Sequence, residues 1–210
     1  MGHEGQAGRG DGLYEYQITG SIAWTAWPSV ALLVTFLGVR RSWGLWRTLG
    51  VLTLGTYAVW MASVGFFPLH FGEGESALGV WRESLNLVPL RTLIDSFGDG
   101  SGTAYLVRVH GGNLLLLAPF TLLGAVMWPR MRRWWKALLV GVGGSLAIEL
   151  TQLALRVVIH PPYRSVDVDD VILNTAGALL GYGVYVVGRG LLSRRRAARQ
   201  ADVLLPDRDA

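Results

Sequence analysis

Five long, predominantly apolar runs limit what this sequence can fold into. They cover Ile18–Val39, Thr48–Leu69, Val109–Trp128, Ala137–Val158 and Val171–Gly188. A helix needs about 20 such residues to cross the hydrocarbon core of a bilayer. Because that core offers no hydrogen-bond partners to the backbone, each run is expected to be helical. The sequence therefore predicts an all-α, polytopic membrane protein with five transmembrane helices.

The composition supports a membrane protein rather than a soluble or nucleic-acid-binding one. Hydrophobic residues make up 51% of the chain and charged residues only 16%, with a mean hydropathy of +0.36. The net charge of +4 comes from basic residues in short tracts between the apolar runs, whereas a nucleic-acid binder would gather them on one face. We therefore expect the protein to interact with the bilayer and not with nucleic acid.

The basic tracts also predict the orientation. They are Arg40, Arg41 and Arg47; Arg130, Arg132, Arg133 and Lys136; and Arg189, Arg194, Arg195, Arg196 and Arg199. Arginine and lysine accumulate in cytoplasmic segments, and these tracts follow the first, third and fifth runs. The N-terminus should then lie outside and the C-terminus inside.

Three regions follow from this topology. Residues 1–17 form a polar N-terminal tail, residues 18–188 the transmembrane domain, and residues 189–210 a basic cytoplasmic tail expected to be disordered after Gln200. In the long outer connection Pro89 suits the first turn of a helix. Apolar residues recur after it at helical spacing, which predicts a short amphipathic helix on the outer face.

The fourth run carries a polar stripe. Glu149, Gln152 and Arg156 are spaced to share one helical face. Glu149 would lie some 13 Å below the outer end of its helix, and an ionisable group at that depth is a functional-site hypothesis by default. It is the candidate acid or base. The alternatives are a structural pair with Arg156 or a protonated carboxyl bonded to an amide.

A second stripe starts just before the fifth run. Asp167, Asp170 and Asn174 repeat at helical spacing, and Asp169 lies beside them. Gly177 and Gly181 continue the stripe and should allow close helix contact. The aspartates could instead be helix caps, and Asn174 could merely bond helices together.

The third run contributes His110 and Asn113, three residues apart on one face. Stacked as antiparallel neighbours, the third, fourth and fifth helices would form a polar funnel open to the outside. Arginines, His110 and the aspartates would line its rim, with the amides below and Glu149 at the bottom. Arg156 and Arg164 would meet anionic groups, while Asn113, Gln152 and Asn174 orient the ligand. Arg156 could alternatively snorkel to the interface.

Four segments resemble the VanZ-like family of membrane proteins. They are "NLVPL" from Asn86, "GGNLLLLAPFTLLG" around Asn113, "SLAIELTQ" with Glu149, and "YRSVDVDDVILNTAGALLGY" from Tyr163. The resemblance covers residues 86–185, roughly the second half of the chain. It implies a multi-pass protein of the bacterial plasma membrane, linked through the founding member to teicoplanin resistance, and adds Asn86 to the candidate binding residues.

These features leave several functions open. The first is a cell-envelope protein whose outward pocket binds the headgroup of a lipid or wall precursor and contributes to glycopeptide resistance. The second is a metal-dependent enzyme acting on a lipid phosphate, with Asp167, Asp169 or Asp170 holding the cation. The third is a proton-coupled transporter, and the fourth a structural scaffold. The scattered histidines form no recognisable metal signature, and the sequence assigns neither cofactor nor oligomeric state.

Overall fold

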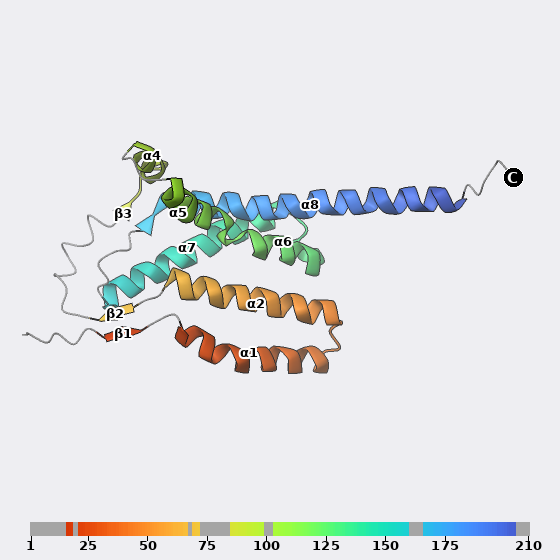
Figure 1. Cartoon of the computed structure of the whole chain (residues 1–210), viewed down its shortest axis with the longest axis horizontal. Coiled ribbons are helices and arrows are strands. Elements are labelled where there is room, and N and C mark those ends of the chain that lie inside the picture. The colour runs from red at the N-terminus through yellow and green to blue at the C-terminus, as the bar shows by residue number, and fades with distance from the viewer. Residues whose placement is uncertain are drawn as a thin grey trace, which may run out of the picture.

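The computed structural model describes residues 16–18, 21–66, 69–71, 85–98, 103–159 and 166–204. Helices dominate them (Figure 1). They are α1 (Ser21–Arg40), α2 (Leu45–Gly65), α4 (Arg91–Gly98), α5 (Thr103–Leu116), α6 (Ala118–Met127), the 3₁₀ turn η1 (Pro129–Met131), α7 (Trp134–Ile159) and α8 (Val168–Leu204). Short strands β1 (Tyr16–Ile18) and β2 (Leu69–Phe71) pair antiparallel, and β3 (Leu85–Asn86) pairs in parallel with β4 (Val166–Asp167). The all-α prediction is confirmed.

Four segments within the described residues are long and apolar enough to cross a membrane. They are Leu45–Gly65, Leu106–Met127, Trp134–Leu155 and Val168–Gln200. They coincide with the second to fifth apolar runs of the sequence. Helix α1 occupies the first run, but a fifth crossing stays a prediction, as does the orientation of the chain.

Helix α8 is the central element of the bundle. It contacts α5, α6 and α7, while α1 contacts α2 and α2 reaches the bundle through α6 (Figure 1). Gly177 and Gly181 explain how the helices approach so closely. A Cβ atom on Gly177 would lie 1.6 Å from the Leu114 carbonyl oxygen, and one on Gly181 would lie 2.1 Å from that of Ala118. The close contact predicted for these glycines is confirmed.

The sequence predicted one continuous helix for the third apolar run, and this was wrong. Helix α5 ends at Leu116 and α6 begins at Ala118. Pro119 has no N–H group, so the Leu115 carbonyl loses its intrahelical donor. The hydroxyl of Tyr57 on α2 donates to the carbonyl oxygens of Leu116 at 3.1 Å and Leu115 at 3.4 Å. The freed backbone groups are thus satisfied by a neighbouring helix.

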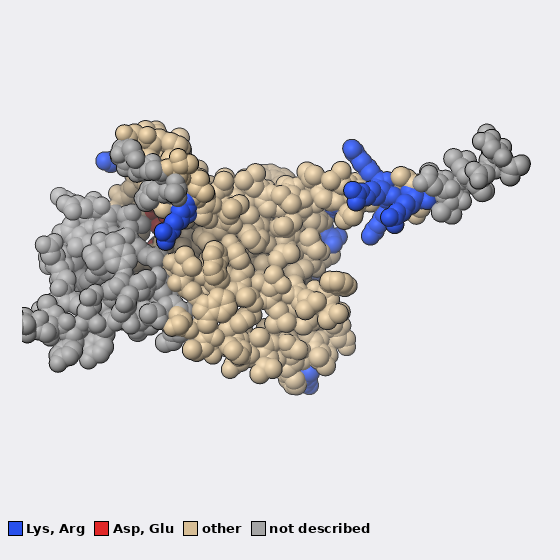
Figure 2. Space-filling view, viewed as in Figure 1, with Lys and Arg blue, Asp and Glu red and all other residues tan. Residues whose placement is uncertain are grey.

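Helix α8 extends well beyond the bundle (Figure 1). Its 37 residues correspond to a length of about 55 Å. The Tyr182 hydroxyl donates to the Arg132 carbonyl oxygen at 3.2 Å, which places Tyr182 level with the connection between α6 and α7. Figure 2 shows the basic side chains gathered on the projecting part. The expectation of disorder after Gln200 was wrong for residues 201–204, which continue the helix.

Replacing Gly177 with alanine should destabilise the bundle, because the new methyl group would collide with backbone rather than with a flexible side chain. We expect a loss of at least about 1–3 kcal/mol, measured by thermal unfolding in detergent. Gly183→Ala is the matched control, since a Cβ atom at Gly183 meets nothing within 4 Å. Equal stability of the two variants would contradict the close contact.

The role of Tyr57 is testable by a double-mutant cycle with Pro119. Tyr57→Phe keeps the ring contacts with Trp60 and Phe120 but removes the hydroxyl donor, at an expected cost of about 1 kcal/mol. In a Pro119→Ala background the cost should shrink, because residue 119 then donates to Leu115. Equal costs in both backgrounds, measured by chemical unfolding, would rule out this coupling.

Candidate functional site

Four carboxylates gather where α8 begins, and we call them the acid cluster: Glu149, Asp167, Asp169 and Asp170. Asp169 is 1% exposed, Glu149 4% and Asp167 5%. Buried charges are costly unless they are paired or hydrogen-bonded. The partners of each carboxylate therefore decide its role.

Asp167 is a structural residue of the outer end of the bundle. Its Oδ1 accepts from the backbone N–H of Asp169 at 2.8 Å, which makes it the N-cap of α8. The same oxygen accepts from Asn86 Nδ2 at 2.9 Å, and Oδ2 accepts from the Thr92 hydroxyl. Because Asn86 also pairs with Asp167 in the parallel β3–β4 ladder, this carboxylate ties the β3–α4 segment to α8.

Asp169 holds the N-terminus of α4. Its carboxylate accepts from the backbone N–H groups of Leu90 and, at 3.1 Å, Leu93. An anion at this position satisfies two unpaired donors and the positive end of the helix dipole. Leu90 has a φ of 65°, in the left-handed region. This explains why α4 begins at Arg91 and Pro89 lies in the preceding turn, instead of in the first helical turn as predicted.

Asp170 and Asn174 join the three helices expected to form the site. The Asp170 carboxylate accepts from Asn113 Nδ2 of α5, and its backbone carbonyl accepts weakly from the Ser145 hydroxyl of α7 at 3.5 Å. Asn174 Nδ2 donates to Ser145 Oγ at 2.9 Å. Asn113, Ser145 and Asn174 thus belong to one polar seam at the junction of α5, α7 and α8.

The sequence indicated that Glu149 lies at the bottom of the polar region, but the structure places it higher. Its Oε2 accepts from the backbone N–H of Asp167 at 3.3 Å, level with the start of α8. The Ser145–Asn174 pair lies about one turn deeper. Helix α7 continues from Glu149 to Ile159, a rise of about 15 Å, so its end is not level with the start of α8. The depth of Glu149 predicted from the length of α7 alone did not include this offset between α7 and α8.

Of the other predicted residues, Gln152 bonds outside the acid cluster. Gln152 Nε2 donates to the Gly65 carbonyl oxygen at the end of α2, at 3.1 Å, so it ties α7 to α2. Arg156 lies in α7, but its side chain is outside the described residues, as is the whole of Arg164. The funnel rim predicted for these arginines thus lies outside the described residues and stays a prediction.

Two buried side chains near the acid cluster have polar atoms without a hydrogen-bond partner among the described residues. His110 is 8% exposed and Asn174 1% exposed. Within the described part of the chain, neither ring nitrogen of His110 has a partner, and the same holds for Asn174 Oδ1. His110 lies one turn from Asn113 on α5, and Asn113 contacts Asp170. Such groups are normally bonded to protein, water or ligand, so they point to the part of the bundle that a ligand would complete.

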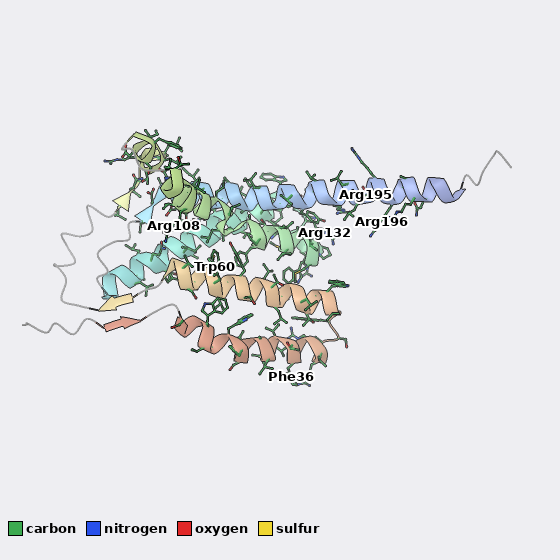
Figure 3. The ribbon with its side chains drawn as sticks, viewed as in Figure 1. Phe36, Trp60, Arg108, Arg132, Arg195 and Arg196 are labelled. Carbon is green, nitrogen blue, oxygen red and sulfur yellow. The ribbon has the colours of Figure 1, made fainter. Side chains whose placement is uncertain are left out.

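Cationic partners of the acid cluster are missing from the described part of the chain. The ion pair found there is Arg91–Asp95, at 3.6 Å on the exposed face of α4. These residues also contain no group of three or more His, Asp or Glu side chains placed to hold a metal ion. Figure 2 shows a small acidic surface at this end of the bundle, and Figure 3 labels Arg108 on α5 beside it.

Sequence reasoning missed Thr92 and Ser145, which donate to the acid cluster and its seam. Ser145 lies one turn before Glu149 on α7, so the fourth-run stripe extended inward would have included it. Thr92 gave no such signal, because only the pairing of β3 with β4 brings it to Asp167. Asn86, which the family resemblance supplied, does contact Asp167.

The chain was also compared with known proteins. A model described as VanZ/LLP1 matches residues 54–189. The chain belongs to the VanZ/LLP1 family. The family match and the four apolar helices together identify a membrane protein of the VanZ type. The VanZ/LLP1 region begins inside α2, so it includes part of a helix that lay outside the resemblance. No curated protein and no solved structure matches the chain.

The hold of Asp169 on α4 is measurable by hydrogen exchange. Asp169→Ala should accelerate exchange of the Leu90 and Leu93 amides at least about tenfold, because each loses a charged acceptor. Asp95→Ala is the control, since Asp95 lies on the same helix with its side chain 68% exposed. Unchanged exchange in Asp169→Ala would contradict the capping role.

Proposed function

We propose that the protein is a cell-envelope protein of the bacterial plasma membrane that binds the polar headgroup of a membrane amphiphile. The amphiphile is a lipid or a wall precursor, and its binding contributes to glycopeptide resistance of the teicoplanin type. With the arginine-rich part of α8 in the cytoplasm, the acid cluster at the other end faces outward. On the outer side of the membrane, a glycopeptide can reach the headgroups of lipids and wall precursors.

The burial and the hydrogen bonding of Glu149 are the observation that supports the proposal. Its side chain is 4% exposed, yet within the described residues it accepts a single hydrogen bond, from the backbone of Asp167. A carboxylate in a membrane helix is expensive unless its acceptors are used. Glu149 therefore has acceptor capacity for a ligand, and it is the group placed to move a proton if chemistry occurs.

Headgroup binding is better supported than a metal-dependent reaction. Asp167 and Asp169, two of the three aspartates proposed to hold a cation, already accept hydrogen bonds from Asn86, Thr92 and the first turn of α4. These donors would compete with a metal ion for the carboxylate oxygens. A ligand that contacts Glu149 and Asp170 leaves this structure intact.

The test is teicoplanin susceptibility of a deletion strain complemented with the full chain. Wild type should restore resistance, and Glu149→Gln should leave the strain as susceptible as the empty vector, because the isosteric amide removes the charge without removing volume. Thr151→Val is the control, since Thr151 is exposed on the same helix and bonds only to Ala147 within it. Full resistance with Glu149→Gln, at equal membrane abundance, would refute the proposal.

A further inference from the structure

Two members of the acid cluster have more unused acceptor capacity than the others. An ionised carboxylate offers about four lone-pair positions. Within the described residues, Asp167 accepts three hydrogen bonds and Asp169 two, whereas Glu149 and Asp170 accept one each at their carboxyl groups. Glu149 bonds to the backbone of Asp167 at the start of α8, and Asp170 lies in the first turn of the same helix, so both carboxyl groups lie at this end of the bundle. They come from different helices, α7 and α8, so a ligand between them would bridge the bundle.

Asn174 supplies a third acceptor in the same seam. Its Oδ1 is buried and has no partner among the described residues, while its Nδ2 donates to Ser145 Oγ. Ser145 in turn reaches the Asp170 carbonyl oxygen, which places the Asn174 amide directly below Asp170. An orphaned amide oxygen in a residue that is 1% exposed is an independent sign of a missing donor.

The unused groups are thus three acceptors, two of them anionic. A primary ammonium group carries one positive charge, three N–H donors and no acceptor, and its hydrogen bonds to carboxylates are charge-assisted. A phosphate would be repelled by both carboxylates. We propose that the headgroup bound by this protein carries a primary ammonium group, held by Glu149, Asp170 and Asn174. This inference rests on the headgroup-binding function proposed above and names its chemistry.

His110 extends the site toward the rest of the headgroup. It lies one turn from Asn113, the residue that contacts Asp170, and both of its ring nitrogens lack partners. A neutral imidazole offers one donor and one acceptor. It would bond the polar atoms next to the ammonium group, as in the phosphoethanolamine headgroup of an aminophospholipid or the free amine of a lipid-linked peptide precursor.

Binding to the purified full chain in detergent micelles tests the inference. The probes are a short-chain phosphatidylethanolamine and the matched phosphatidylcholine, which keeps the positive charge but has no N–H donors. We expect the choline lipid to bind at least about tenfold more weakly. Equal binding of the two lipids would overturn the proposal, because charge alone would then suffice.

Variants locate the ammonium group. Glu149→Gln and Asp170→Asn should each weaken binding of phosphatidylethanolamine at least about tenfold. Asp95→Asn changes the net charge equally on exposed α4 and should bind like wild type. Thermal unfolding confirms that each variant is folded. If one variant does not fold, the other and the two-lipid comparison decide, and unchanged binding in a folded variant overturns the proposal.

Two further arms separate the sources of the amine. Soluble ethanolamine tests the ammonium group alone, and a polyprenyl-linked peptide bearing a free amine tests a wall precursor. Tight binding of any amine-bearing probe that is lost in Glu149→Gln supports the proposal, and the tightest probe names the source. If none binds while teicoplanin resistance still requires Glu149, the ammonium inference fails and headgroup binding stands. If resistance is independent of Glu149, the proposed function itself fails.

Discussion

The need of buried carboxylates for hydrogen-bond donors organises the outer end of this protein. Asp167 and Asp169 draw the segment from β3 to α4 onto the start of α8, although some 80 residues separate these parts of the chain. The N-terminus of α8 donates to Asp167, and the N-terminus of α4 donates to Asp169. Their N–H groups and dipoles stabilise negative charge, so this region does not require arginine partners for Asp167 and Asp169.

The same junction depends on helices that approach unusually closely. Without side chains at Gly177 and Gly181, α8 contacts the backbone of α5 and α6 directly, which brings Asn113 within reach of Asp170. In a bilayer, small residues at a helix interface allow the packing that lipid itself does not drive. The break before Pro119 lies next to this contact, and Tyr57 stabilises it. The close packing of α8 against α5 and α6 therefore also determines the geometry of the site.

Sequence periodicity predicted most of the architecture, because hydrophobic length and helical spacing are local signals. It placed four spans, the polar and glycine stripe of α8, and Asp167 as a cap. It failed where an answer depends on how two helices are offset, as for the depth of Glu149, or on a non-local strand pairing, as for Thr92. It also assigned Gln152 to the site, whereas this side chain bonds to the end of α2. None of these relations is encoded within one helix.

The four carboxylates of the acid cluster differ in how many hydrogen-bond donors they contact, and this difference distinguishes structural carboxylates from candidate ligand-binding ones. Asp167 and Asp169 accept hydrogen bonds that hold secondary-structure elements together, so their charges are accounted for by the fold. Within the described residues Glu149 and Asp170 accept one each, and two ionised carboxylates in a site of low polarity would repel each other. A positively charged donor between them would remove this repulsion and satisfy Asn174. Under the proposed function the bound headgroup would satisfy these acceptors, and its recognition would be coupled to the packing of α7 against α8.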